Sequence, residues 1–162
     1  MASVDYFLKI ENIDGESEDA DHKGWIDVLS WSWGETQTGS MAYGGGGGAG
    51  KVSMQDFHFT MRVCKGSPKL LEACASGEHF AKADLVARKA GKTQVKFLKI
   101  KFSDLLVSSF QTGGTGSGDP VPIDQISLNY AKIEYEYKAQ KPDGTLDGAI
   151  SAGWNLKENK KV

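Results

Sequence analysis

Apolar and polar residues alternate along most of this chain, which is the period of a β-strand and not of a helix. Tyr6, Leu8 and Ile10 begin the pattern. The expected strands cover residues 5–11, 26–37, 52–62, 81–89, 94–102, 105–111, 125–138 and 150–156. The last of them is expected to close the sheet. The protein is therefore predicted to be mainly β.

Two of these strands change the face that carries their apolar residues. In the strand over 52–62, the apolar residues before Gln55 are even-numbered and those after it are odd-numbered, which a bulge would explain. The strand over 125–138 slips in the same way after Ala131. Bulges curve a strand, and strongly curved sheets usually close into barrels. We therefore expect an antiparallel β-barrel of about eight strands.

One helix is expected over residues 68–76. Ser67 is the predicted N-cap, Pro68 suits the first helical position, and Gly77 suits the residue that ends the helix. This helix is expected to flank the barrel. With 162 residues, the chain has the size of one ordinary domain, and we expect a single domain over 1–162.

Charge and hydropathy exclude two classes of partner. Lys and Arg number 19 against 21 Asp and Glu, so there is no basic excess for nucleic acid. The longest purely aliphatic run is 105–107, whereas a membrane helix needs about 20 apolar residues, so no membrane insertion is expected. The N-terminus lacks a signal-peptide pattern, which places the newly made chain in the cytoplasm.

A glycine-rich run resembles a phosphate-binding P-loop, in which Gly45 and Gly50 precede Lys51. That motif next requires Ser or Thr at the start of a helix, but Val52 and an alternating strand follow here. We interpret the run as a loop and expect no cofactor. A long glycine-rich loop in a small domain is usually functional or disordered.

The other candidate chemical groups occur singly. His22, His58 and His79 lack metal-ligand spacing and are expected on the surface or in packing contacts, and Cys64 and Cys74 are expected to be reduced thiols. No catalytic or metal-ligating residue is predicted, and the chain is not expected to be an enzyme. Because triads are assembled in space, a small hydrolase stays open as an alternative, as does a monomeric ligand-binding barrel.

Several segments together resemble the haemolysin-coregulated protein (Hcp) family of type VI secretion. The most specific are the two tryptophans of 26–34 and the glycine run of 44–52. The matching segments are 26–34 (IDVLSWSWG), 39–40 (GS), 44–52 (GGGGGAGKV), 55–57 (QDF), 67–68 (SP), 73–74 (AC), 76–77 (SG), 88–91 (RKAG), 106–109 (LVSS), 128–131 (LNYA) and 153–155 (GWN). The resemblance extends over nearly the whole chain.

This resemblance implies a β-barrel subunit that forms a homo-hexameric ring. Stacked rings would form the inner tube of a contractile injector, with a spike protein at its tip and a sheath around it, and would carry and chaperone small effector proteins in the lumen. The tube protein would leave the cytoplasm through the injector without a signal peptide. The loop expected to join one ring to the next contains Ser40, Met41, Tyr43, Gly44, Gly45, Gly46, Gly47 and Gly48.

Alternation in the strand over 26–37 predicts which residues meet an effector. If Leu29, Trp31 and Trp33 fill the barrel, Ser30 and Ser32 must point outward, because successive strand side chains point to opposite faces. Small hydroxyls suit a lumen wall that binds a passenger weakly. We therefore expect Ser30 and Ser32 to line the lumen.

Overall fold

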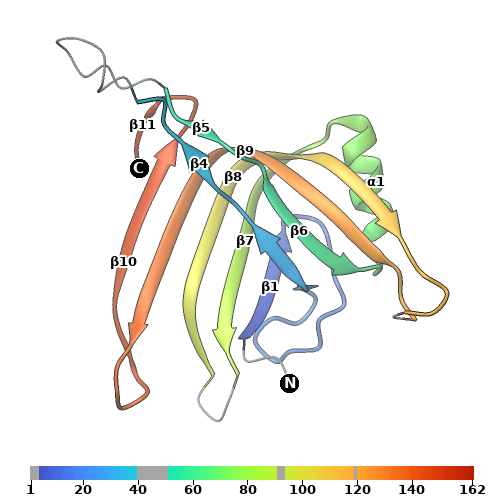
Figure 1. The fold of residues 1–162 in the computed structure, drawn as a ribbon, viewed down its shortest axis with the longest axis horizontal. Helices are drawn as coiled ribbons and strands as arrows, with labels where there is room; N and C mark the ends of the chain where they lie inside the picture. The colour runs from blue at the N-terminus through green and yellow to red at the C-terminus, as the bar shows by residue number, and fades with distance from the viewer. Residues whose placement is uncertain (1–3, 40–50, 91–93, 119) are drawn as a thin grey trace.

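The computed structural model describes residues 4–39, 51–90, 94–118 and 120–162. It is mainly antiparallel β with a single α-helix among these residues, which confirms the expected fold class (Figure 1). The strands are β1 (Val4–Ile10), β2 (Ile26–Val28), β3 (Ser30–Ser32), β4 (Glu35–Thr36), β5 (Ser53–Met54), β6 (Phe57–Arg62), β7 (His79–Lys89), β8 (Val95–Gly113), β9 (Ile123–Gln140), β10 (Leu146–Asn155) and β11 (Lys160–Lys161). The helix is α1 (Ser67–Ser76).

The strand pairings follow a curved sheet that returns on itself. β9 pairs with β8, β8 with β7, β7 with β1, and β1 with β2. β3 pairs with β6, which pairs with β9. Leu29 joins β2 to β3, and its backbone N–H donates to the Thr60 carbonyl at 2.9 Å. The chain over 26–32 thus connects β1 to β6, so that β6, which pairs with both β3 and β9, completes the barrel.

The inside of the barrel is filled by side chains. Phe57, Phe59 and Phe102 are its largest fully buried residues, and Phe57 lies 4.8 Å from Phe102 between ring centroids. Leu8 and Ile100 are fully buried beside them. The long apolar strands therefore close over a packed core.

In β9 the buried side chains do change from even to odd positions after Ala131, as predicted, but the pairing register with β8 does not shift there. Tyr130 and Ile133 are both buried, and their partners on β8, Leu105 and Phe102, are buried too. Both strands therefore change face at the same level, where Asp104 has a left-handed backbone with φ 52°. Because the irregularity is matched across the pair, the sheet bends there without a bulge.

The expected strand boundaries were wrong in several places. The run over 26–37 is divided into β2, β3 and β4, the run over 52–62 into β5 and β6, and two expected strands are joined in β8. β11 is an additional strand, so the described residues form eleven strands and not about eight. The expectation that the strand over 150–156 closes the sheet was also wrong. This region lies in β10, which pairs with β9 and β11 and extends the sheet, whereas β6 completes the barrel.

Leu29 is a second correction. Val28 is 7% exposed and Leu29 is 40% exposed, so the inward face changes from even to odd positions between β2 and β3. Trp31 and Trp33 do pack against the core, as predicted. The reason is the change of partner: β2 pairs with β1 and β3 with β6.

The helix has the predicted extent, but its N-cap is Gly66 and not Ser67. Ser67 is instead buried, and its hydroxyl donates to Asp124 Oδ2 at 2.6 Å while accepting the Cys64 N–H at 3.0 Å. Gly77 ends the helix in a left-handed conformation with φ 71°, as expected. Ser67 therefore joins the start of α1 to a fully buried carboxylate.

Replacing Ser67 by alanine is expected to lower the free energy of unfolding by about 1–3 kcal/mol, the usual cost of leaving a buried polar group without its partner. Asp124 is 0% exposed and loses a charge-assisted hydrogen bond. Urea denaturation at fixed protein concentration measures the change. Ser76→Ala, at the exposed end of the same helix, is the control and is expected to change stability by less than about 0.5 kcal/mol. Equal effects of the two variants would contradict this role.

Candidate functional site

Ser30 and Ser32 lie on the outside of the barrel. Both are exposed on β3, while Trp31 between them packs against the core. On the neighbouring strand, Ser30 is opposite Thr60 and Ser32 is opposite His58. The Ser30 and Thr60 hydroxyls are 2.6 Å apart. The sequence prediction that these two serines point outward therefore agrees with their exposure.

The strand register extends this surface across β9 and β8. Each serine of β3 begins a row of four cross-strand neighbours that carry hydroxyl, amide or imidazole groups. The rows are Ser30, Thr60, Gln125 and Gln111, and Ser32, His58, Ser127 and Ser109. Most of these residues line a shallow hollow of about 360 Å³. We call these eight residues the hydroxyl face.

Sequence reasoning found only two members of the hydroxyl face. Alternation along β6, where His58 and Thr60 lie between buried Phe57, Phe59 and Met61, could have identified two more. It could not have shown that they lie beside Ser32 and Ser30, because that depends on which strands pair.

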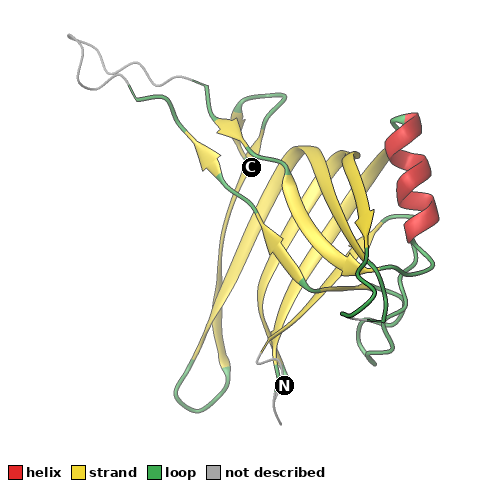
Figure 2. Ribbon diagram, turned by 45° about the vertical axis from the view of Figure 1, so that its right-hand side comes forward, coloured by secondary structure: helices red, strands yellow, loops and turns green. Residues whose placement is uncertain are grey.

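The eight residues expected in the ring-stacking loop, Ser40, Met41, Tyr43 and Gly44–Gly48, lie outside the described residues. The chain on either side of them forms an arm of two short strands, β4 and β5, which projects away from the barrel (Figure 2). We define the arm as residues 35–37 and 51–54. A strand follows Lys51 where a P-loop has a helix.

Beyond the barrel, β9 and β10 carry apolar residues on one face. Tyr135 is 41% exposed, Tyr137 is 44% exposed and Ile150 is 74% exposed. We call the following set the apolar face: Ile133, Tyr135 and Tyr137 on β9, with their partners Trp154, Ala152 and Ile150 on β10. Exposed aromatic and aliphatic residues gathered on one sheet are typical of a protein interface.

A cleft of about 990 Å³ separates part of the apolar face from the arm. Trp31, Trp33 and Met54 line it on one side, and Tyr135 and Trp154 on the other. The Trp154 indole N–H is buried there without a hydrogen-bond partner in the described part of the chain. The cleft is thus mostly apolar.

A smaller exposed apolar group lies at the other end of the molecule. Leu71 on α1 is 54% exposed, and Val63, between β6 and α1, is 37% exposed. Figure 1 shows α1 and β10 on opposite sides of the barrel. The apolar face and the two exposed residues Val63 and Leu71 therefore belong to elements at opposite sides of the barrel.

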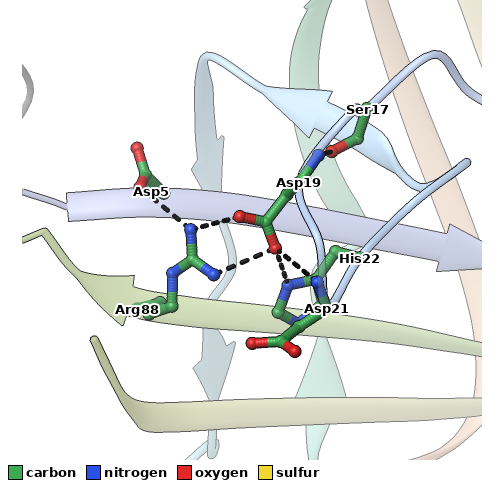
Figure 3. A network of polar contacts seen from close by, with 6 residues as sticks. All are labelled: Asp5, Ser17, Asp19, Asp21, His22 and Arg88. Atoms are coloured by element: carbon green, nitrogen blue, oxygen red, sulfur yellow. Dashed lines mark hydrogen bonds and ion pairs between the residues drawn. The ribbon is translucent and has the colours of Figure 1, made fainter. Parts of the chain in front are cut away.

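The acidic segment over 13–24 is partly buried, and a polar cluster joins it to the barrel (Figure 3). Arg88 of β7 donates to both carboxylate oxygens of Asp19, at 2.6 Å and 2.9 Å. Asp5 lies 3.5 Å from the same guanidinium. His22 is 1% exposed, lies 2.9 Å from Asp19 through Nδ1 and stacks on Phe7.

The electrostatics of this cluster favour the charged carboxylate. The hydrogen bonds from Arg88 hold the pKa of Asp19 well below its usual range, in spite of desolvation by burial, and His22 acts in the same direction. Asp19 in turn raises the pKa of Arg88. The cluster binds the segment over 13–24 to β7, so it is a structural element. His22 is a packing histidine, as predicted.

His58 and His79 are exposed on strands, and Cys64 and Cys74 are free thiols that pack partly against the core. In the described ranges, no three His, Cys, Asp or Glu side chains come together as a metal site would need. Among the same residues, no helix has the length and apolar character to span a membrane.

Comparison with known proteins identifies relatives over the whole chain. A family model described as "Type VI secretion system effector, Hcp" matches residues 7–137. Protein hcp1 of Pseudomonas aeruginosa is 48% identical over 159 residues, which are 97% of this chain and 98% of the relative.

Solved structures agree with this match. A structure described as a type six secretion system protein is 33% identical with a TM-score of 0.93, over 98% of this chain and 99% of the other. Hcp1 from Salmonella typhimurium is 34% identical with a TM-score of 0.83, over 99% of this chain and 100% of the other.

Proposed function

Since the chain belongs to the Hcp family of secreted type VI secretion system tube proteins, we propose that six copies close into a ring and that such rings stack into the tube. In this proposal the whole chain, 1–162, acts as one domain. Its partners are other copies of itself, the spike and sheath of the apparatus, and small effectors carried in the lumen. It is made in the bacterial cytoplasm and leaves the cell through the apparatus.

The main support for the proposed ring is that one chain has two different sets of exposed apolar residues, on opposite sides of the barrel. A contact that joins two different surfaces is head-to-tail, and repeated contacts of this kind close into a ring when the rotation permits. Here the apolar face of β9 and β10 supplies one surface, and Leu71 with Val63 supplies the other. Within the described residues, the stretch 149–152 of β10 pairs with β9 alone, which leaves an open strand edge in the same surface.

The mass of the protein in solution tests the ring directly. Light scattering at micromolar concentration is expected to give an assembly of six chains. A stable monomer at that concentration would contradict the ring and would favour the alternative of a monomeric ligand-binding barrel. The barrel interior already supports the ring over this alternative, because Phe57, Phe59 and Phe102 fill the space that a ligand would need.

We further propose that the protein acts without a catalytic step. The three histidines lie on different elements: His22 is buried beside Asp19, whereas His58 is exposed on β6 and His79 on β7. Lys51 precedes a strand and not the helix of a P-loop. Nucleotide turnover that is lost in Lys51→Ala would contradict this.

In the stacked tube, the segment containing Ser40, Met41, Tyr43 and Gly44–Gly48 is proposed to contact the next ring. Its support is the projecting arm, whose two paired strands, β4 and β5, precede and follow this segment in the sequence (Figure 2). A glycine-rich sequence between two such strands is suited to a contact that forms when a second ring arrives.

The hydroxyl face is the proposed wall of the lumen. Seven of its eight residues line the hollow and extend the predicted pair Ser30 and Ser32 across four strands with hydroxyl, amide and imidazole groups, whereas Ser127 is only 2% exposed. Such groups hold a folded passenger through few contacts, which permits its release. The outer wall of the ring is the other position open to an outward face.

Replacing Ser32 by glutamine is expected to leave the ring intact and to lower the amount of effector retained by at least fivefold. The added bulk is on an exposed strand position, where substitutions usually change stability by less than about 0.5 kcal/mol. Co-purification of an effector with the ring measures retention. Ser117→Gln, in the exposed loop over 114–122, is the control. An intact ring with unchanged retention would place Ser32 on the outer wall.

A further inference from the structure

The direction of the arm is decided where it joins the barrel. β4 and β5 form a sheet of only two strands and pair with no other strand in the described part of the chain. At the base of the arm, the Gln55 N–H donates to the Gly34 carbonyl at 2.9 Å. Of the arm's own side chains, Met54 packs partly against the core, whereas Glu35, Thr36 and Ser53 are exposed. Contacts at the base must therefore orient it.

One contact comes from inside the barrel. The Trp33 indole N–H donates to the Tyr130 hydroxyl, which donates to the Gln55 carbonyl at 3.0 Å. Tyr130 is 4% exposed, and its burial raises its pKa to about 12. The phenol therefore keeps its proton, and with it the hydrogen bond to the backbone, throughout the physiological pH range.

A second contact holds the next residue from outside. Asp56 accepts from the Ser108 hydroxyl at 2.6 Å and from the Asn129 amide at 2.8 Å. Ser108 lies where the register of β8 against β9 shifts, and its hydroxyl is also 2.7 Å from that of Ser127. The irregularity in β8 thus supplies a hydroxyl to the base of the arm.

We propose that Tyr130 and Asp56 are positioning residues that fix the arm in the direction in which it meets the next ring. Together they hold consecutive residues, Gln55 and Asp56, from opposite sides of the chain. Hydrogen bonds depend on direction, so two such contacts on neighbouring residues restrain the angle at which β5 leaves β6. This inference rests on the stacking role proposed above for the segment between β4 and β5.

The test uses Tyr130→Phe, which removes only the hydroxyl, and Asp56→Ala, which removes the outer acceptor. Both variants are expected to form rings of the native mass, while tube formation from purified rings, followed by electron microscopy, falls at least fivefold. In single rings, hydrogen exchange at the Gln55 amide is expected to become at least tenfold faster. Exchange in β8 away from the base is expected to stay as in the native ring.

A matched control separates positioning from general loss of stability. Leu70→Ala removes a fully buried side chain of α1 and so lowers the stability of the protein at a site away from the arm. If it reduces tube formation as much as Tyr130→Phe, or if exchange at Gln55 is unchanged in both arm variants, the positioning role is overturned. Normal tubes from Tyr130→Phe and Asp56→Ala would overturn it as well.

A second control tests the premise alone. Deleting residues 42–49 is expected to leave single rings and abolish tubes. Tubes from this deletion variant would show that the segment between β4 and β5 does not stack rings, and both proposals would then fail. Loss of tubes here together with normal tubes from the two arm variants would overturn the positioning role and leave the stacking role in place.

Discussion

Replacing Arg88 by methionine is expected to lower the free energy of unfolding by about 3–5 kcal/mol, because it removes one partner of a buried ion pair. The Arg88 side chain is 4% exposed and that of Asp19 is 17% exposed, so the remaining carboxylate would stay buried without its main donor. The segment over 13–24 would also lose its connection to β7. Chemical denaturation at fixed protein concentration measures the loss.

A neighbouring residue provides the control for this prediction. Lys89→Met removes a cation next in the chain whose hydrogen bond, to Gln140, is exposed. It is expected to cost less than about 1 kcal/mol. If Arg88→Met were no more destabilising than Lys89→Met, the cluster around Asp19 would not hold the segment over 13–24.

The same cluster predicts a specific pH dependence. Arg88 lowers the pKa of Asp19 in the folded protein, so the resulting stabilisation is fully present above the ordinary aspartate value of 3.8. It is lost progressively as the pH falls below that value. In Arg88→Met, this part of the decrease in stability below pH 4 should be absent, which denaturation at several pH values would reveal.

Replacing Ile150 by glutamate is expected to convert the ring into single chains. Ile150 is 74% exposed in one chain, so the substitution should not disturb folding, and circular dichroism should be unchanged. In the proposed ring, the new carboxylate would be desolvated at every one of the six contacts, and burying an unpaired charge is costly. Light scattering is expected to show the mass of one chain.

The adjacent residue offers a matched control on the same strand. Ala149→Glu places the same charge on the opposite face of β10, beside Lys138 of β9. This variant is expected to keep the mass of six chains. A six-chain assembly from Ile150→Glu would mean that the apolar face is not between copies, and the ring would then need another contact.

The sequence by itself determined the class of fold, the helix and the family. Period-two alternation reports a half-buried strand because neighbouring side chains point to opposite faces, and Pro68 and Gly77 mark a helix through their own backbone preferences. The slip after Ala131 was visible for the same reason. These are local signals, which neighbouring residues produce together. The family match confirmed the resemblance that rested on such short segments.

Only the tertiary structure decided how these elements meet. β6 and not β10 completes the barrel, and Ser67 binds Asp124 instead of capping its helix. Arg88 forms hydrogen bonds with Asp19, 69 positions away in the sequence, and Trp33 forms one with Tyr130, 97 positions away. Alternation states which way a side chain points, but strand register states what lies opposite it. Register is set by packing between distant parts of the chain, and no local pattern contains it.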